Sequence, residues 1–196
     1  MAAYRHLLFQ APRGRRTYAY VLLNGVFHSG VFTWLGVYFA QRYGLGEIGI
    51  GLALLGYGIP GFLFGPVIGR ATDRLGRGRL LPIGFAIGGV SAVGLACDVP
   101  LGVSVALVTM LSLGYDMTQP LLAGIVTDLG SQRGLAMGLN VFLLFTGFGV
   151  GSLIFGVMLT LGFERALGWF GTIVLIAATI AVPLFRDEQV QRRQAS

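Results

Sequence analysis

Charged residues are scarce in this 196-residue sequence, where only 11% of the positions are Asp, Glu, Lys or Arg. A soluble domain of ordinary composition carries about a quarter charged residues. Hydrophobic residues make up 55% of the chain, in runs too long and too numerous for the core of one globular domain. This composition excludes a conventional soluble protein and predicts an all-α integral membrane protein in contact with a lipid bilayer.

Lysine is absent, so all fourteen basic residues are arginine, and Cys97 is the single cysteine. One cysteine excludes an internal disulfide and offers no metal-ligand pattern. The sequence also lacks paired carboxylates and a phosphate-binding loop. We therefore expect no enzymatic activity, no cofactor and no metal site. The arginines occur in short blocks between apolar runs, which indicates membrane topology rather than a nucleic-acid partner.

Six apolar runs are each long enough to cross a bilayer as a helix, which takes about 20 residues. They are residues 17–40, 48–69, 80–96, 101–126, 135–161 and 167–185. We expect a six-helix transmembrane domain at 17–185, preceded by a basic segment at 1–16 and followed by a tail at 186–196.

The arginines are distributed unevenly along this pattern. If successive connections lie on alternate faces of the membrane, one face holds twelve of the fourteen arginines, and the other holds only Arg42 and Arg165. Short arginine-rich loops stay in the cytoplasm. The bias therefore predicts that both termini are cytoplasmic, and we expect the plasma (inner) membrane as the location.

The most specific pattern in the chain is the arginine-rich segment between the second and third runs. It fits G-x3-D-[RK]-x-G-[RK]-x-[RK] at Gly69, Asp73, Arg74, Gly76, Arg77 and Arg79. This segment resembles the signature loop of the major facilitator superfamily, which joins the second and third helices of a six-helix half. An ordinary basic loop would explain the arginines, but not the aspartate or the glycines. The resemblance implies that Asp73 and its arginines form a gate on the cytoplasmic side.

A possible internal repeat supports the same architecture. GYGIPGFLFG at 56–65 is similar to GFGVGSLIFG at 147–156, an offset of 91 residues. In the superfamily each half is a 3+3 inverted repeat, because a three-helix unit ends on the opposite face from its start. GPVIG at 65–69 and GFGVG at 147–151 are expected to allow close helix packing.

Polar residues inside the apolar runs are the candidates for function, because a polar group in hydrocarbon needs a partner or a water-filled cavity. The resemblance implies that the first and fourth helices line a central path. The candidates are Asn24, His28, Tyr115, Asp116 and Gln119, with Asn140 in the fifth run. Asp116 and His28 are the candidates for proton coupling, and packing or hydrogen-bonding roles remain open for the others. We expect Pro60 and Pro120 to kink their helices.

Two departures from the superfamily pattern indicate which half this is. The fourth run lacks the arginine of many proton-coupled first halves, and Ser152 follows Gly151 where antiporters carry Gly-Pro. The chain therefore looks more like a C-terminal half. The resemblance implies a secondary transporter of a small solute, completed by a second six-helix half or by a homodimer. The alternative is a non-transporting scaffold subunit or a truncated, inactive half.

Overall fold

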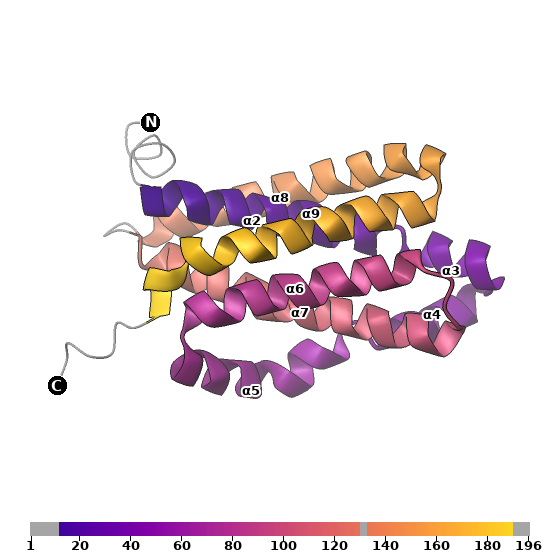
Figure 1. Cartoon of the computed structure of the whole chain (residues 1–196), viewed down its shortest axis with the longest axis horizontal. Coiled ribbons are helices and arrows are strands. Elements are labelled where there is room, and N and C mark those ends of the chain that lie inside the picture. The colour runs from indigo at the N-terminus through magenta and orange to yellow at the C-terminus, as the bar shows by residue number, and fades with distance from the viewer. Residues whose placement is uncertain (1–11, 130–132, 190–196) are drawn as a thin grey trace.

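The computed structural model describes residues 12–129 and 133–189, and the regular elements in these ranges are helical (Figure 1). Six helical stretches among them are long and apolar enough to cross a membrane, which confirms the six predicted spans. The start of α2, the turn between α5 and α6, and the end of α9 lie at one end of the bundle (Figure 1). Most of the predicted basic segment at 1–16, and residues 190–196 of the tail, lie outside the described residues.

The first two spans are each divided into two helices. The first consists of α2 (Pro12–Phe32) and α3 (Leu35–Tyr43), and the second of α4 (Glu47–Leu55) and α5 (Ile59–Leu75). Gly56, Tyr57 and Gly58 separate α4 from α5, and Pro60 lies in the first turn of α5. Because proline has no backbone N–H, it cannot extend the hydrogen-bond ladder of a preceding helix. The predicted kink at Pro60 is thus an interruption of the span just before it.

The arginine-rich segment was expected to be a loop at 70–79, and this is wrong. α5 continues to Leu75 and α6 (Arg77–Ala96) begins two residues later, so Gly76 alone makes the turn. Its φ of 82° and ψ of 156° lie in a region that side chains disfavour, which explains glycine there. Hydropathy indicates which residues lie in the hydrocarbon layer, but not where a helix ends. α5 therefore extends beyond the apolar run and includes Arg70 and Arg74.

The remaining helices follow the predicted bounds closely. They are α7 (Leu101–Thr127), α8 (Arg133–Met158), the 3-10 turn η2 (Leu159–Leu161), α9 (Phe163–Leu184) and the 3-10 turn η3 (Arg186–Gln189). Pro120 lies inside α7, whose helix continues past it.

The helix bounds favour a different register for the predicted repeat. Leu75 and Leu161 end the second and fifth spans, a spacing of 86 residues. Gly162 lies 86 residues after Gly76 and has a similar backbone conformation, with φ 97° and ψ 154°. This spacing supports 86 rather than 91 as the offset between corresponding residues.

Glycines hold the central helices at close range. A Cβ on Gly147 of α8 would lie 2.6 Å from the Leu22 carbonyl oxygen of α2. A Cβ on Gly171 of α9 would lie 2.8 Å from the Gly89 carbonyl oxygen of α6. The expected role of GFGVG in close packing is therefore confirmed. The parallel expectation for GPVIG is wrong within this chain, because a Cβ on Gly65 or Gly69 would meet nothing within 4 Å.

The second span is the least buried of the six. Only 11% of its apolar window is buried, against 56% for α6. In Figure 1, α5 lies at the edge of the bundle, and its largest contact is with α7. Apolar side chains such as Phe62 of α5 and Phe142 of α8 are exposed, as expected for surfaces that meet lipid or another membrane protein.

Candidate functional site

Polar side chains of the first and fourth spans meet where α2 and α7 cross. The Asn24 amide donates a hydrogen bond to the Gln119 side-chain oxygen at 3.1 Å. The Asn24 oxygen accepts one from the Thr118 hydroxyl at 2.9 Å. Asn24 is only 2% exposed, so its polar groups are satisfied by α7 rather than by solvent. This amide pair fixes the register between the two helices.

His28 lies one turn further along α2, in a cluster of aromatic rings. Its ring stacks on Tyr115 with centroids 3.6 Å apart, and its Nδ1 is 2.7 Å from the Tyr57 hydroxyl. The rings of Phe32 and Phe148 lie within 5.7 Å of it. Four spans therefore meet at one imidazole, because His28 belongs to the first span, Tyr57 to the second, Tyr115 to the fourth and Phe148 to the fifth.

Asp116 points toward the second span. Its Oδ2 is 3.1 Å from the Ser112 hydroxyl, one turn earlier on α7. A Cβ on Gly61 of α5 would come within 2.9 Å of the carboxylate carbon, so the small residue admits the acid at this point. The Ser112 hydroxyl also contacts the carbonyl oxygen of Tyr57, in the interruption of the second span.

A groove of about 560 Å³ runs beside this acid, between α5 and α7. Its polar lining includes Tyr115, Asp116 and Gln119 from α7, Asp73 from α5, and Arg77 from α6. On the α5 side, three of the lining residues are glycines without side chains, Gly61, Gly65 and Gly69. The groove thus joins the polar residues in the middle of α7 to the arginine-rich segment at the end of α5.

The predicted site residues divide into three groups. Tyr115, Asp116 and Gln119 line the groove, as do Gly69, Asp73 and Arg77 of the arginine-rich segment. Asn24 and His28 do not line the groove, but Asn24 bonds to Gln119 and His28 stacks on Tyr115, which do. Asn140 is apart from both, because it is 2% exposed and, within the described ranges, its Oδ1 has no hydrogen-bond partner.

The arginine-rich segment is tied to the end of α7. Arg77 pairs with Asp128 at 2.5 Å, and Arg70 donates to the Pro66 carbonyl oxygen of its own helix at 3.2 Å. Arg74 and Arg79 are exposed, and Gly76 forms the turn between them. The segment therefore holds the ends of α5, α6 and α7 together at one face of the bundle.

A second cluster lies at the same face. Glu188 of η3 pairs with Arg13 at 2.7 Å and Arg16 at 2.8 Å, both from the start of α2. Burial acts to raise the pKa of Glu188, but hydrogen bonds and the charge of the two arginines outweigh it and leave the pKa below its ordinary value. The first and last described elements are joined by these pairs.

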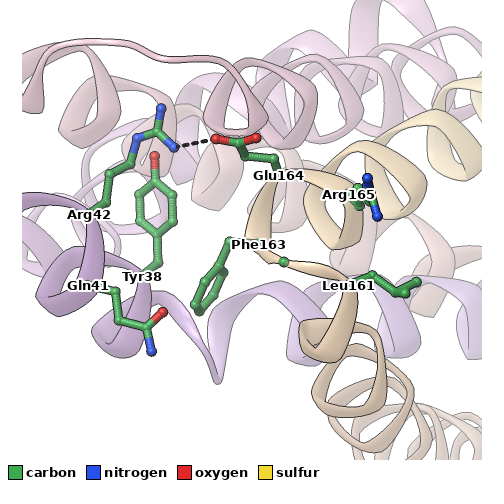
Figure 2. Close-up of a pocket in the computed structure, with 8 residues that line it drawn as sticks. Tyr38, Gln41, Arg42, Leu161, Phe163, Glu164 and Arg165 are labelled. Atoms are coloured by element: carbon green, nitrogen blue, oxygen red, sulfur yellow. Dashed lines mark hydrogen bonds and ion pairs between the residues drawn. The ribbon is translucent and has the colours of Figure 1, made fainter.

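A smaller pocket, of about 440 Å³, opens at the opposite face of the bundle (Figure 2). Arg42 reaches across it to Glu164 at 3.4 Å, while Arg165 lies on its far side (Figure 2). Arg42 also pairs with Asp98 at 2.9 Å and donates to the Cys97 carbonyl oxygen. One guanidinium thus links the ends of the first, third and sixth spans.

Three further residues hold the site together, of which sequence reasoning missed Tyr57 and Ser112. Thr118 binds Asn24, Tyr57 binds His28, and Ser112 contacts both Asp116 and the Tyr57 backbone. Two signals were available: Tyr57 lies between two glycines just before a proline, and Ser112 precedes Asp116 by one helical turn.

The fold and this groove define a polytopic α-helical membrane protein whose polar residues meet inside a bundle of six spans. The sequence model of the Major Facilitator Superfamily matches residues 17–196, and the chain belongs to this superfamily. Over 107 residues it is 35% identical to the multidrug transporter AQR1 of Candida glabrata. That similarity covers 54% of this chain and only 18% of the length of the relative. Family and relative together indicate membrane transport rather than catalysis.

Proposed function

We propose that the chain acts as one six-helix unit of a secondary active transporter and that a small solute passes along the groove between α5 and α7. The observation that carries this proposal is a carboxylate, Asp116, in the middle of an apolar span and on the wall of a 560 Å³ groove. An acid in this position is expensive in hydrocarbon and marks a solute or proton pathway by default.

Proton coupling follows from the same acid. A carboxyl group that exchanges a proton between two membrane faces needs access to water and a polar partner for each state. The groove supplies the access, and Ser112 supplies a hydroxyl that both donates and accepts. His28 is a second proton-accepting group nearby, and its ring contacts the rings of Tyr115 and Tyr57. Asp116 and His28 therefore remain our candidates for proton coupling.

The residues around the groove favour a small organic solute. Gln119 and Tyr115 offer hydrogen-bonding groups beside the carboxylate. The relative from Candida glabrata is described as a multidrug transporter, and a drug-like solute is a reasonable first probe for this chain. Transport would draw on an ion gradient.

Closure of the path is proposed to need a second six-helix unit. The groove is partly open and lies next to the least buried span, so lipid would face the half-buried Asp116 and Gln119 if nothing covered them. A second half of the same superfamily, or a second copy of this chain, would supply the missing wall. We further propose that each unit is a 3+3 inverted repeat, supported by the 86-residue spacing between the ends of the second and fifth spans.

Membrane orientation is part of the proposal. The start of α2, the turn between α5 and α6, and the end of α9 lie together at one end of the bundle (Figure 1). Together with η3, which follows α9, these segments hold eight of the eleven arginines in the described residues. The positive-inside rule places that end in the cytoplasm, at the inner face of the plasma membrane. Asp73 and the arginines around Gly76 would then form the gate on the cytoplasmic side.

A transport assay in proteoliposomes tests the proposal. An imposed pH gradient is expected to drive uptake or release of a fluorescent drug-like probe, and Asp116→Asn is expected to abolish the gradient-driven part. Asp187→Asn is the matched control, because Asp187 is an exposed acid of η3 outside the groove. Cross-linking of the same sample reports whether a dimer is the active species. Flux that is absent from every oligomeric form, with or without a second half, would instead support a scaffold subunit or an inactive half.

A further inference from the structure

The interruption of the second span is fastened to the neighbouring helices by Tyr57. The Tyr57 hydroxyl bonds to His28 of α2 at 2.7 Å, and the Tyr57 carbonyl oxygen accepts from the Ser112 hydroxyl of α7. Gly56 comes so close to α7 that a Cβ there would overlap the Thr109 hydroxyl. The backbone between α4 and α5 therefore rests on α7, and the Tyr57 N–H also bonds to the Leu54 carbonyl oxygen of α4 at 2.9 Å.

Ser112 has one proton and two acceptors. Its hydroxyl contacts the Tyr57 carbonyl oxygen on one side and Asp116 Oδ2, at 3.1 Å, on the other. A serine hydroxyl donates one hydrogen bond and accepts up to two. When Asp116 is ionised, the carboxylate and the carbonyl compete for this single proton. When Asp116 is protonated, it donates to the Ser112 oxygen, and Ser112 is free to donate to Tyr57.

We infer that Ser112 couples the protonation of Asp116 to the docking of the interrupted second span on α7. Protonation of Asp116 completes the chain of donors from acid to hydroxyl to Tyr57 carbonyl and holds the interruption against α7. Loss of the proton turns Ser112 toward the carboxylate and releases Tyr57, while the Gly61 backbone stays hydrogen-bonded to the carboxylate. The rest of α5 then swings about its first turn and widens the groove. Ser112 is thus a positioning residue, and this inference rests on the proposed role of Asp116 in proton coupling.

The packing of α5 allows such a swing. Pro60 is its only buried residue, and a Cβ on Gly58, Gly65 or Gly69 would meet nothing within 4 Å. α5 is 17 residues long, or about 25 Å at 1.5 Å per residue, so a rotation of about 10° moves its end at Leu75 by about 4 Å.

Other titratable and charged groups face the same region and must be separated from Asp116. They are His28 from α2, Tyr57 in the interruption, Tyr115 on α7, Asp73 from α5 and Arg77 from α6. His28 acts on the Tyr57 side chain, whereas Ser112 acts on the Tyr57 backbone. The two routes can therefore be cut one at a time.

Spin-label distances on the full chain in lipid nanodiscs test the inference. Labels are placed at Leu75, at the end of α5, and at Val182, near the end of α9, because both side chains are exposed. Cys97 is replaced by serine in every sample. The distance distribution is measured at about pH 5 and about pH 9, which bracket the usual carboxyl and histidine ranges. The wild type is expected to give a narrow distribution at low pH and one shifted by several ångströms at high pH.

Four variants give distinct outcomes. Asp116→Asn keeps the shape of the protonated acid and donates through its amide, so it is expected to stay narrow at both pH values. Ser112→Ala removes the link and is expected to lose the pH-dependent shift. Ser91→Ala is the matched control, because this buried serine bonds only its own helix. His28→Gln is expected to retain the shift.

The inference is overturned if Ser112→Ala keeps the wild-type shift, or if Asp116→Asn is as displaced as the wild type at high pH. Should Ser112→Ala fail to fold, the isosteric Asp116→Asn variant decides by itself. The readout needs no transported solute. A pH-dependent shift without any flux would support the coupling through Ser112 and reject the proposed transport. Flux that needs Asp116 but occurs without the shift would support transport and reject the coupling through Ser112.

Discussion

Gly114 offers a sharp test of how α6 and α7 are held together. A Cβ at this position would lie 2.7 Å from the Gly84 carbonyl oxygen and 2.8 Å from the Gly88 backbone nitrogen. Ordinary contacts begin at 3.4 Å, so Gly114→Ala requires the two helices to separate by roughly 0.7 Å. The obstructing atoms are backbone, which cannot rotate away as a flexible side chain can.

Overpacking of this kind costs about 1–3 kcal/mol, and the better helix propensity of alanine returns up to about 1 kcal/mol. We therefore expect Gly114→Ala to lower the free energy of unfolding by about 1–2 kcal/mol, measured by SDS titration in mixed micelles. Gly138→Ala is the control, since a Cβ on this exposed glycine of α8 meets nothing within 4 Å. If Gly114→Ala proves as stable as Gly138→Ala, the close approach of α6 and α7 described above is incorrect.

Three further predictions concern polar contacts. Arg42→Gln removes the guanidinium that hydrogen-bonds to the Cys97 carbonyl oxygen. We expect maleimide labelling of Cys97 to accelerate by about two- to fivefold, which corresponds to the free energy of one exposed ion pair. An unchanged rate would mean that Arg42 does not restrain the end of α6. Because the folded-state pKa of Glu188 is lowered, its ion pairs stabilise the protein at pH values above the ordinary carboxyl pKa of 4.5, and this stability is lost as the pH falls through the lowered pKa. Glu188→Gln is expected to remove the contribution of this group to the pH dependence of the melting temperature. Asn24→Leu breaks two interhelical hydrogen bonds and is expected to destabilise by about 1 kcal/mol in the SDS titration, whereas a neutral result would show that Gln119 and Thr118 find other partners.

Hydropathy predicted the number and order of the spans well, because the length of an apolar run reports directly on the thickness of the bilayer. It did not predict where the second span ends. Arg70, Asp73 and Arg74 remain helical beyond the apolar run of the second span, since a helix is as acceptable in water as a loop once its ladder has begun. Pro60 predicted a kink at this place, but hydropathy did not indicate the interruption at Gly56–Gly58, because the residues around it are as apolar as a continuous span.

The candidate site was partly predictable for a similar reason. Asp116, Tyr115 and Gln119 stood out as polar residues in an apolar run, and the structure places all three on one groove. Ser112 did not, because a hydroxyl in a membrane helix usually bonds to its own backbone and carries no distinctive signal. Gly65 and Gly69 had the spacing of a packing motif, but spacing alone does not say whether a second helix is there.

The order in which the helices contact one another has a consequence for synthesis of the protein. α2 packs mainly on α8, and α6 packs mainly on α9 and α7, so the largest interfaces join the first three spans to the last three. A ribosome that has released only the first three spans has made little of this packing, and α2 waits in the membrane until α8 is inserted. The early spans must therefore be held by the insertion machinery or by lipid, and assembly of the bundle waits for insertion of the last three spans.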